Sequence, residues 1–308
     1  SIKQGSETFI RPVMTDRPAE PKTAIPDNPP LPTINLDDLP PEFSWTNYDG
    51  DWTSPVKDQG SCGSCWAFSA IAIMESSINL ASGFPDTDID LSEQYILSCL
   101  PYGGSCGGGW TDDALEAIIS TSPTIGNGIN GVTTEDCMSY EAIDYLPCSD
   151  KCDDWDYLTD PVAPDNKLWE LESWGANHAL ENDNPADINI VKGYLLEYGP
   201  LSASMYVDSG FQTYWNSHDD PDDWYFGEDS YSTNHAVELV GWKDDATVTN
   251  GGFWRLKNSW GTDFGYGGYF NVAYGGLNIG ERVRWCSTTE WPQSAQGPGP
   301  GEFDMAIF

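Results

Sequence analysis

The stretch at residues 58–71 reads DQGSCGSCWAFSAI and decides most of the predicted fold. Two cysteines, Cys62 and Cys65, stand three positions apart among Gly and Ser, and an almost unbroken apolar run follows. Residues 64–80 therefore predict a helix that is apolar nearly all round, which is typical of a helix buried at the centre of a domain. Gly83 is expected to end it, because glycine adopts the left-handed conformation found at helix C-termini.

The Cys-x-x-Cys spacing alone allows four interpretations. A zinc site needs a second pair of ligands, and the most similar pair, Cys148 and Cys152, lies in a weakly patterned segment. A thioredoxin-like redox pair needs a βαβ setting, which the sequence does not predict here. A purely structural pair is the third. In the fourth, Cys62 forms a disulfide elsewhere and Cys65 stays free in the first turn of the helix, where the helix dipole and unpaired N–H groups favour a thiolate.

A thiolate nucleophile needs a base, and the base needs a group that orients it. Of the three histidines, His178 and His218 lie in acidic, loop-like stretches and are expected at the surface. His235 instead opens an apolar strand, where packing gives no reason for a histidine. Asn258, on the next strand, is placed to orient the His235 ring, and Trp260 to shield that hydrogen bond from water.

The overall charge excludes two classes of partner. The chain has 308 residues with 13 Lys+Arg against 49 Asp+Glu, a formal net charge of -36. Such a surface repels nucleic acid and anionic membranes, and no apolar run is long enough to span a bilayer. Eight cysteines fit an oxidising compartment, so the protein is expected to be secreted or extracytoplasmic. The absence of an Asn-x-Ser/Thr sequon favours a prokaryotic source.

Pattern and composition predict an α+β fold with two lobes, because helices dominate the first half of the chain and strands the second. The predicted helices cover residues 64–80, 91–100 with Ser92 as N-cap, 111–122 with Thr111 as N-cap, and 186–199. The predicted strands cover 201–207, 235–242, 251–258, 267–274 and 280–285. The expected parts are a Pro-rich segment 1–38, a domain 39–286 and a tail 287–308. Within the domain we expect a left lobe at about 50–150, an acidic surface excursion at 149–185 and a right lobe at 186–286.

Several sequence blocks, in the same order, resemble the papain-like cysteine peptidases, the family that includes the cathepsins. The resemblance runs from about Pro40 to Trp285. The blocks are PVKDQGSCGSCWAFS at 55–69, LSEQYILSC at 91–99, SCGGGW at 105–110, EYGPLSASMYV at 197–207, NHAVELVGW at 234–242 and WRLKNSWGTDFGYGGYF at 254–270.

The resemblance implies a two-lobed fold with a cysteine endopeptidase site between the lobes. It assigns Cys65 as nucleophile, His235 as general base and then acid, and Asn258 as the residue that orients His235. Gln59 and the backbone N–H of Cys65 would hold the oxyanion of the intermediate. The implied resting state is a thiolate–imidazolium pair, and the implied intermediate is a thioester. The short gap between Cys99 and Cys106 favours an endopeptidase over an exopeptidase.

The resemblance also implies substrate-binding residues. Gly108 and Gly109 would present backbone to an extended peptide, and Asn234 stands where many relatives have Asp. Either Glu281 or Arg282 would form the base of the pocket for the second residue before the scissile bond; Glu281 would also admit Arg there, whereas Arg282 would favour acidic residues. The expected lining of this pocket suggests an apolar or aromatic preference and consists of Trp110, Thr111, Ser204 and Ala236. Trp260 is a further expected binding residue.

Cysteine pairing follows from the resemblance in part. Cys62–Cys106 matches a family disulfide, and Cys99 is expected to pair with Cys148, with Cys137 or Cys152 as rivals. Since seven cysteines remain besides Cys65, at least one is unpaired or joins another chain, and Cys286 is the candidate.

The N-terminal segment carries a net charge of +1 over residues 1–26 (4 basic, 3 acidic), whereas the remainder carries 9 basic and 46 acidic residues. We expect residues 1–38 to be either a short inhibitory prosegment or a disordered tether. The expected partners are polypeptide substrates, with no cofactor and a monomeric chain. The acidic loops at 218–223 and 243–252 lack regular Ca²⁺-ligand spacing, so no metal is expected. An inactive binding protein and an acyl-transferring relative remain alternative functions.

Overall fold

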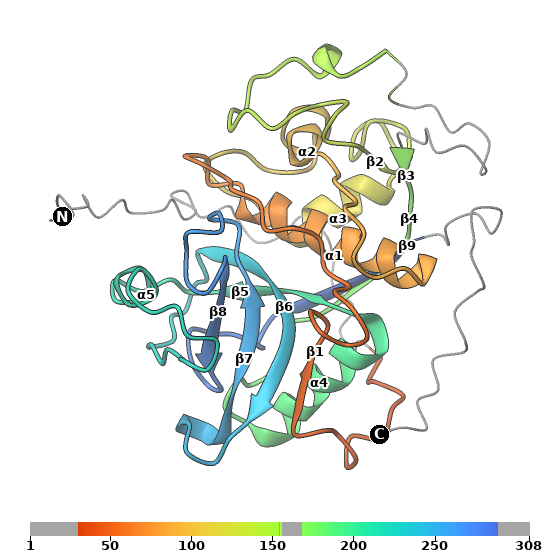
Figure 1. Cartoon of the computed structure of the whole chain (residues 1–308). Helices are drawn as coiled ribbons and strands as arrows, with labels where there is room; N and C mark the ends of the chain where they lie inside the picture. Colours follow the sequence, from red (N-terminus) through yellow and green to blue (C-terminus); the bar gives the residue numbers. More distant parts are fainter. Residues whose placement is uncertain (1–29, 154, 156–167, 289–308) are drawn as a thin grey trace, which may run out of the picture.

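The computed structural model describes residues 30–153, 155 and 168–288. The start of the Pro-rich segment, the middle of the expected excursion and nearly all of the C-terminal tail lie outside the described residues. The described chain has two lobes, with α1, α2 and α3 in one and a large antiparallel sheet in the other (Figure 1). The α+β, two-lobed prediction is confirmed.

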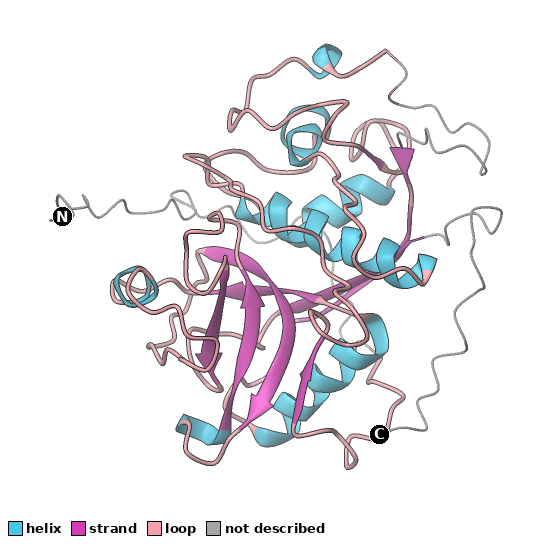
Figure 2. Cartoon of the chain, viewed as in Figure 1, coloured by secondary structure: helices cyan, strands magenta, loops and turns pink. Residues whose placement is uncertain are grey.

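The left lobe is built around the helix predicted from the opening stretch. Helix α1 runs from Cys65 to Ser82, is buried along most of its length and ends at Gly83, whose φ is 71°. It crosses the boundary between the lobes and packs against strands of the sheet (Figure 2). The other elements are α2 (Glu93–Cys99), α3 (Thr111–Ile119), η1 (Cys148–Asp150) and the small pair β2 (Val132–Thr133) and β3 (Leu168–Trp169).

The two short helices begin differently. The Ser92 side chain accepts a hydrogen bond from the Tyr95 backbone N–H, so the predicted cap of α2 is confirmed. The prediction that Thr111 caps α3 is wrong, because the N-cap is Trp110 and Thr111 is the first helical residue. The Thr111 hydroxyl instead donates to the Trp66 carbonyl at 3.4 Å, which ties α3 to α1.

The right lobe is an antiparallel sheet in the order β4-β9-β5-β6-β7-β8, with β1 paired to β6. The central strand β6 begins at His235 and is buried over most of its length, so its first side chain is held firmly. The elements are β1 (Glu42–Ser44), β4 (Leu171–Asn177), α4 (Pro185–Tyr198), β5 (Leu201–Met205), α5 (Phe211–Trp215), β6 (His235–Asp244), η2 (Thr249–Gly251), β7 (Gly252–Lys257), β8 (Tyr269–Ala273) and β9 (Val283–Thr288).

The prediction of a surface excursion at 149–185 is wrong for its second half. Residues 171–177 form β4, which pairs with β9 at one end of the main sheet. Leu171 and Ala176 are buried, whereas Glu172 points to solvent. The acid-rich sequence before β4, together with the exposed Glu172 within it, made this part of the chain resemble a loop in composition.

The described part of the Pro-rich segment lies along α4. The Tyr194 hydroxyl donates to the Pro30 carbonyl at 2.8 Å, and the Thr33 hydroxyl donates to the Glu197 carboxylate at 3.0 Å. Residues 30–38 are therefore attached to the right lobe.

Three disulfides join described residues, all in the left lobe. Cys62–Cys106 and Cys99–Cys148 are the two expected pairs, and the third is Cys137–Cys152. Cys65 and Cys286 are free, buried thiols. Across the described ranges, the one cluster of potential metal ligands is Cys62, Cys106 and Asp144, and its two sulfurs are bonded to each other. No helix there is long and apolar enough to cross a membrane.

Candidate active site

Cys65 is the first residue of α1, and its side chain is fully buried. Burial raises the pKa of its thiol to about 12, while hydrogen bonds from backbone N–H groups of Ala236, Trp66 and Cys65 itself act to lower it. Ala236 directly follows His235, so this contact brings the start of β6 to the sulfur. The first turn of α1 in the left lobe therefore lies near the start of β6 in the sheet.

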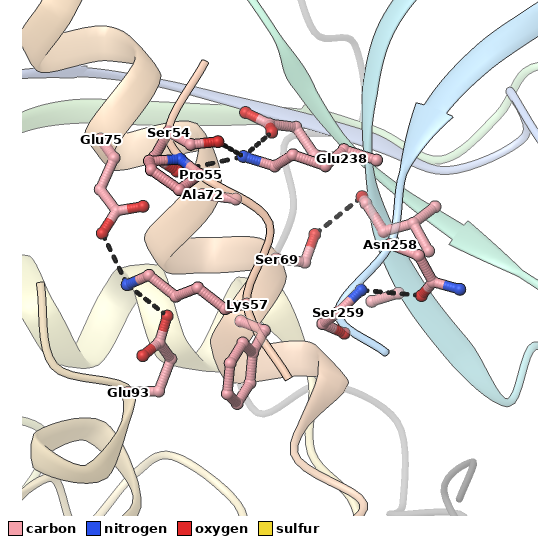
Figure 3. A pocket seen from close by; sticks show the side chains of 14 residues that line it. Ser54, Pro55, Lys57, Ser69, Ala72, Glu75, Glu93, Glu238, Asn258 and Ser259 are labelled. Atoms are coloured by element: carbon pink, nitrogen blue, oxygen red, sulfur yellow. Dashed lines mark hydrogen bonds and ion pairs between the residues drawn. The ribbon is translucent and has the colours of Figure 1, made fainter. Parts of the chain in front are cut away.

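His235 is held by Asn258 and Trp260. The Asn258 Oδ1 lies 2.8 Å from His235 Nε2, and because a carbonyl oxygen only accepts, Nε2 carries the hydrogen. The same Oδ1 accepts from the Ser259 backbone N–H at 2.9 Å (Figure 3), which fixes the amide orientation. The Trp260 ring stacks on the imidazole, with centroids 4.7 Å apart. His235 Nδ1 is buried and has no hydrogen-bond partner within the described chain.

Burial also sets the charge of the imidazole. It lowers the pKa of His235 to about 4, against a smaller opposite effect of the Asn258 hydrogen bond. Taken singly, both the thiol and the imidazole are therefore neutral near pH 7. A thiolate–imidazolium pair needs the mutual attraction of the two charges, which is strong in a buried site, so it stays a prediction.

The Gln59 side chain is hydrogen-bonded to both lobes. Its Nε2 donates to the Cys62 carbonyl at 2.9 Å, and its Oε1 accepts from the Ser259 hydroxyl at 2.7 Å. An amide nitrogen carries two hydrogens, so one N–H remains. The Gln59 side chain is fully buried, so the surrounding packing restricts its rotation.

The two expected substrate-binding glycines differ in their surroundings. The N–H and C=O of Gly108 are both bonded to Ser105, at 3.0 and 2.9 Å. A Cβ on Gly109 would lie 2.5 Å from the Trp66 ring, so only glycine fits there. Of the pair, Gly109 is the better candidate for contacts with a peptide backbone.

Among the remaining expected binding residues, Asn234 and Ala236 flank His235 in the sequence. Ser204 pairs with Ala236 in the β5–β6 register. Asn234 is turned toward the end of β5, because its Oδ1 accepts from the Val207 N–H at 2.7 Å. Trp110, Thr111, Ser204 and Ala236 are all at least 95% buried.

The structure places a buried polar cluster here that sequence reasoning missed. The fully buried Arg284 donates from Nη2 to Asp112 at 2.7 Å and from Nη1 to the Ser204 hydroxyl at 2.6 Å. His178 Nε2 lies 3.1 Å from Asp112, and its side chain is only 13% exposed. The prediction that His178 is a surface residue is therefore wrong. Burial and Arg284 lower the pKa of His178.

Glu281 and Arg282, the alternatives for the pocket base, point to different neighbours. Both carboxylate oxygens of Glu281 accept from Asn278 Nδ2 at 3.1 Å. The Arg282 guanidinium carbon instead lies 5.6 Å from the centre of the Trp110 ring. Arg284, and not either of these, bonds to Ser204.

Two lysines, Lys57 partly buried and Lys257 almost fully buried, line a small cavity of about 20 Å³ between α1 and the sheet (Figure 3). Lys57 contacts Glu75 at 2.8 Å, Asp90 at 2.7 Å and Glu93 at 3.0 Å. Lys257 contacts Glu238 at 2.8 Å. Since Lys257 immediately precedes Asn258, this second pair supports the end of the strand that positions His235.

The chain is similar to several known proteins. The profile of the papain family cysteine proteases matches residues 39–287. Fruit bromelain from Ananas comosus is 30% identical over 79% of this chain and 57% of its own length, and cathepsin B-like CP1 of Giardia intestinalis is 30% identical over 78% and 70%. The chain thus spans less than two thirds of fruit bromelain.

A solved structure of bromelain with the E64 inhibitor is 25% identical, covers 81% of this chain and 99% of that one, and has a TM-score of 0.57. Procathepsin L2 from Tenebrio molitor, 24% identical over 83% and 69% of the two chains with a TM-score of 0.60, shares the fold. None of these four proteins is prokaryotic, so the expected prokaryotic source is not supported.

Proposed function

Because the chain belongs to the papain family of cysteine proteases, we propose that it hydrolyses peptide bonds with Cys65 as nucleophile and His235 as base. The observation that carries this proposal is the buried His235 ring, which Asn258 fixes through Nε2 and whose Nδ1 has no hydrogen-bond partner within the described chain, together with the free, buried Cys65 thiol. A buried thiol, an available imidazole nitrogen and an orienting amide form the arrangement that nucleophilic catalysis requires.

The proposed reaction has two halves. The Cys65 proton passes to His235 Nδ1, and the thiolate attacks the scissile carbonyl carbon. The imidazolium returns the proton to the departing amine, which leaves a thioester on Cys65. Water, deprotonated by His235, then hydrolyses the thioester and releases the acid product. Because both groups are neutral when taken singly, we expect their proton transfers to titrate as one coupled pair.

Gln59 and the backbone N–H of Cys65 are the proposed oxyanion donors. The amide of Gln59 is held by Cys62 and Ser259, so its second N–H is oriented before substrate arrives. Donors fixed in advance cost no reorganisation in the transition state. Gln59→Ala should lower kcat by about 10²–10³-fold.

We propose that the substrates are polypeptides cleaved internally, with Gly109 binding the peptide backbone. The three disulfides favour an extracytoplasmic location for this activity. Residues 1–26 carry a net positive charge, whereas the rest of the sequence is strongly acidic, and this difference supports an inhibitory role for the N-terminal segment. Protein with and without residues 1–29 should differ in activity, more at low salt than at high salt; equal activity at all salt concentrations would favour the tether.

The test of the function is alkylation by a peptidyl epoxide followed by peptide mapping. The thiolate opens the epoxide and forms a C–S bond, so one adduct should appear on the Cys65 peptide. Cys286, also a free buried thiol, is the internal control and should stay unmodified. His235→Ala should slow alkylation strongly near neutral pH, because it removes the base. A Cys65 thiol that does not react would support the inactive binding protein.

Hydrolase and transferase are separated by the fate of the thioester. With a fluorogenic peptide and an added amine nucleophile, a hydrolase releases mainly the free acid. A transferase releases mainly the amide. Asn258 and Trp260 lie beside His235 in both reactions, so the relative amounts of free acid and amide decide between hydrolase and transferase.

A further inference from the structure

The Tyr140 hydroxyl lies between Gln59 and Ser64, the two ends of the loop 59–64 that precedes the nucleophile. It is 2.9 Å from the Gln59 backbone carbonyl and 2.6 Å from the Ser64 hydroxyl. Gln59 carries one proposed oxyanion donor on its side chain, and Ser64 is followed by Cys65, whose backbone N–H is the other. One side chain from a distant part of the left lobe therefore contacts both ends of this loop.

The direction of the two hydrogen bonds follows from the atoms that make them. A carbonyl oxygen only accepts, so the single hydrogen of the Tyr140 hydroxyl goes to Gln59. The Ser64 hydroxyl then donates to the Tyr140 oxygen. Burial raises the pKa of Tyr140, so the phenol keeps its hydrogen. The result is a directed chain of hydrogen bonds from Ser64 through Tyr140 to Gln59.

The Tyr140 contact also accounts for the unusual start of α1. Ser64 is the N-cap residue of this helix, yet its side chain makes no hydrogen bond to the helix. An N-cap serine normally accepts from a backbone N–H of the first turn. Here its hydroxyl is turned toward Tyr140 instead. The Ser64 side chain therefore does not compete with an anion for the N–H groups at this end of the helix.

Tyr140 is itself held firmly. Its backbone N–H donates to Glu135 Oε1 at 2.6 Å, and its ring packs edge-on against Phe68 of α1, with centroids 4.8 Å apart. The disulfide between Cys137 and Cys152 closes the segment that carries it. The hydroxyl is thus fixed by its own segment and can hold the loop 59–64 in place.

The Gln59 carbonyl has one other hydrogen bond within the described chain, from the Cys62 N–H at 3.4 Å. That distance is longer than the usual range for N–H to O bonds, whereas the Tyr140 bond is well within the range for hydroxyl donors. Without the Tyr140 hydroxyl, the backbone of Gln59 would therefore keep only the weaker of its two acceptor bonds.

We propose that Tyr140 is a positioning residue of the oxyanion hole, which holds Gln59 and Ser64 so that the donors beside them are oriented before substrate arrives. This inference rests on the proposed peptidase function. Tyr140 acts through these two residues and not on the substrate itself. Its contribution belongs to the transition state, because donors fixed in advance need no reorganisation when the oxyanion forms.

The test is Tyr140→Phe, which removes the hydroxyl and keeps the ring on Phe68. Two reactions of Cys65 are compared. Peptide hydrolysis passes through an oxyanion, whereas alkylation by iodoacetamide forms a C–S bond and expels iodide without one. For a fluorogenic peptide, kcat/KM should fall by about 10-fold, less than the loss of about 10²–10³-fold expected for a whole donor. The rate constant for alkylation of the Cys65 peptide should not change.

Two further variants separate positioning from general loosening. Tyr95→Phe is the matched control, because Tyr95 is a fully buried tyrosine of α2 in the same lobe whose hydroxyl accepts from Asn127. It should leave both rates unchanged, even where urea unfolding shows lower stability. In a Gln59→Ala background, Tyr140→Phe should lower kcat/KM by less than it does in the wild type, because one of the residues through which it acts is already lost.

If Tyr140→Phe does not fold, Ser64→Ala takes its place, because it removes the other hydrogen bond of the same hydroxyl. It should also lower kcat/KM without changing the alkylation rate. Unchanged kcat/KM in the variant that is assayed, or hydrolysis and alkylation falling in the same proportion, overturns the inference. An undiminished effect of Tyr140→Phe in the Gln59→Ala background also overturns it.

The same experiments keep the two proposals apart. If the wild type is alkylated at Cys65 and cleaves peptides while Tyr140→Phe behaves identically, only this inference fails and the peptidase stands. If the wild type neither reacts with the peptidyl epoxide nor cleaves peptides, the proposed function itself is wrong and this inference falls with it. Alkylation of the wild type without cleavage of any peptide also counts against an oxyanion hole at this loop.

Discussion

The two lobes support the same active site by different means. The left lobe joins short helices through long irregular segments, and all three disulfides between described residues cross-link it. The right lobe is an antiparallel sheet over a core rich in aromatic rings, among them Trp215, Trp242, Trp254 and Trp260. A disulfide stabilises the folded state most where no ladder of hydrogen bonds between strands already restricts the chain. Cys65 therefore depends on covalent bonds in its lobe, whereas His235 depends on packing.

The buried charges repeat this contrast. On the left-lobe side, Lys57 is surrounded by three carboxylates, so the group has an excess of negative charge. On the sheet, Lys257 and Glu238 form a balanced pair with both side chains at most 5% exposed. An excess of buried carboxylates makes the free energy of unfolding depend on pH. A balanced ion pair instead makes it sensitive to a mutation that removes one of the two charges.

The largest expected effect comes from the disulfide beside the nucleophile. Cys62→Ser/Cys106→Ser opens a loop with a sequence separation of 44, which should cost about 4 kcal/mol of unfolding free energy. Because Gly63 and Cys106 are also hydrogen-bonded immediately before α1, activity should fall with it. Urea unfolding and kcat/KM measure the two losses.

The matched control is Cys137→Ser/Cys152→Ser, whose sequence separation is 15. The shorter loop predicts a smaller loss, about 3 kcal/mol. If neither double variant differs from the wild type, the left lobe does not need its cross-links and the comparison between the lobes fails.

The next effect is expected at the balanced pair. Lys257→Met leaves the Glu238 carboxylate buried without its cation, which should cost about 3 kcal/mol. Lys257→Met/Glu238→Gln should recover most of that loss in urea unfolding, because both charges are gone. Equal instability of the single and double variants would show that lysine packing, and not the ion pair, supports β7.

A pH-dependent effect is expected at the acidic cluster. Burial, together with the nearby Glu75 carboxylate and against the pull of Lys57, raises the pKa of Glu93 from 4.5 to about 8. The folded state holds this proton more tightly than the unfolded state does, so its stabilising contribution is complete below about pH 4.5 and is lost as the pH rises through 8. Glu93→Gln mimics the protonated form.

Glu93→Gln should therefore unfold at higher urea than the wild type at pH 8.5, by on the order of 2 kcal/mol, and show no advantage at pH 4. Asp90→Asn is the control, because Asp90 is a second partner of Lys57 whose side chain is 56% exposed. Water already solvates that carboxylate, so the change should be small at both pH values. A constant difference between Glu93→Gln and the wild type across this range would argue against a proton held in the cluster.

Much of this architecture is predictable from local pattern. The apolar run after Cys65 predicts α1, Gly83 ends it, and alternating apolar residues predict β5 to β9 within a few positions. The buried acids and lysines are less accessible to prediction. Arg284 and Asp112 are 172 residues apart in sequence, and each looks like a surface residue until the other is placed beside it. The same holds for His178.

The strand β4 shows a second limit. Burial does not alternate regularly along its seven residues, so the strand lacks the period-2 pattern that predicts a strand from sequence. Pairing with β9, more than a hundred residues later, decides its conformation. Tertiary pairing overrides local propensity most easily at the end of a sheet.

The smallest expected effect tests packing on the right lobe. Gly193 lies inside α4, where alanine would normally stabilise the helix by about 1 kcal/mol. A Cβ there would come within 2.6 Å of Leu36 and 2.8 Å of Pro32, both in the segment that lies along α4. Gly193→Ala should therefore gain less than about 1 kcal/mol, with faster amide exchange across 30–38. If the variant gained the full helix-propensity stabilisation and amide exchange across 30–38 did not change, the segment along α4 would have moved aside without cost. Packing of the right lobe would then be looser than its aromatic core implies.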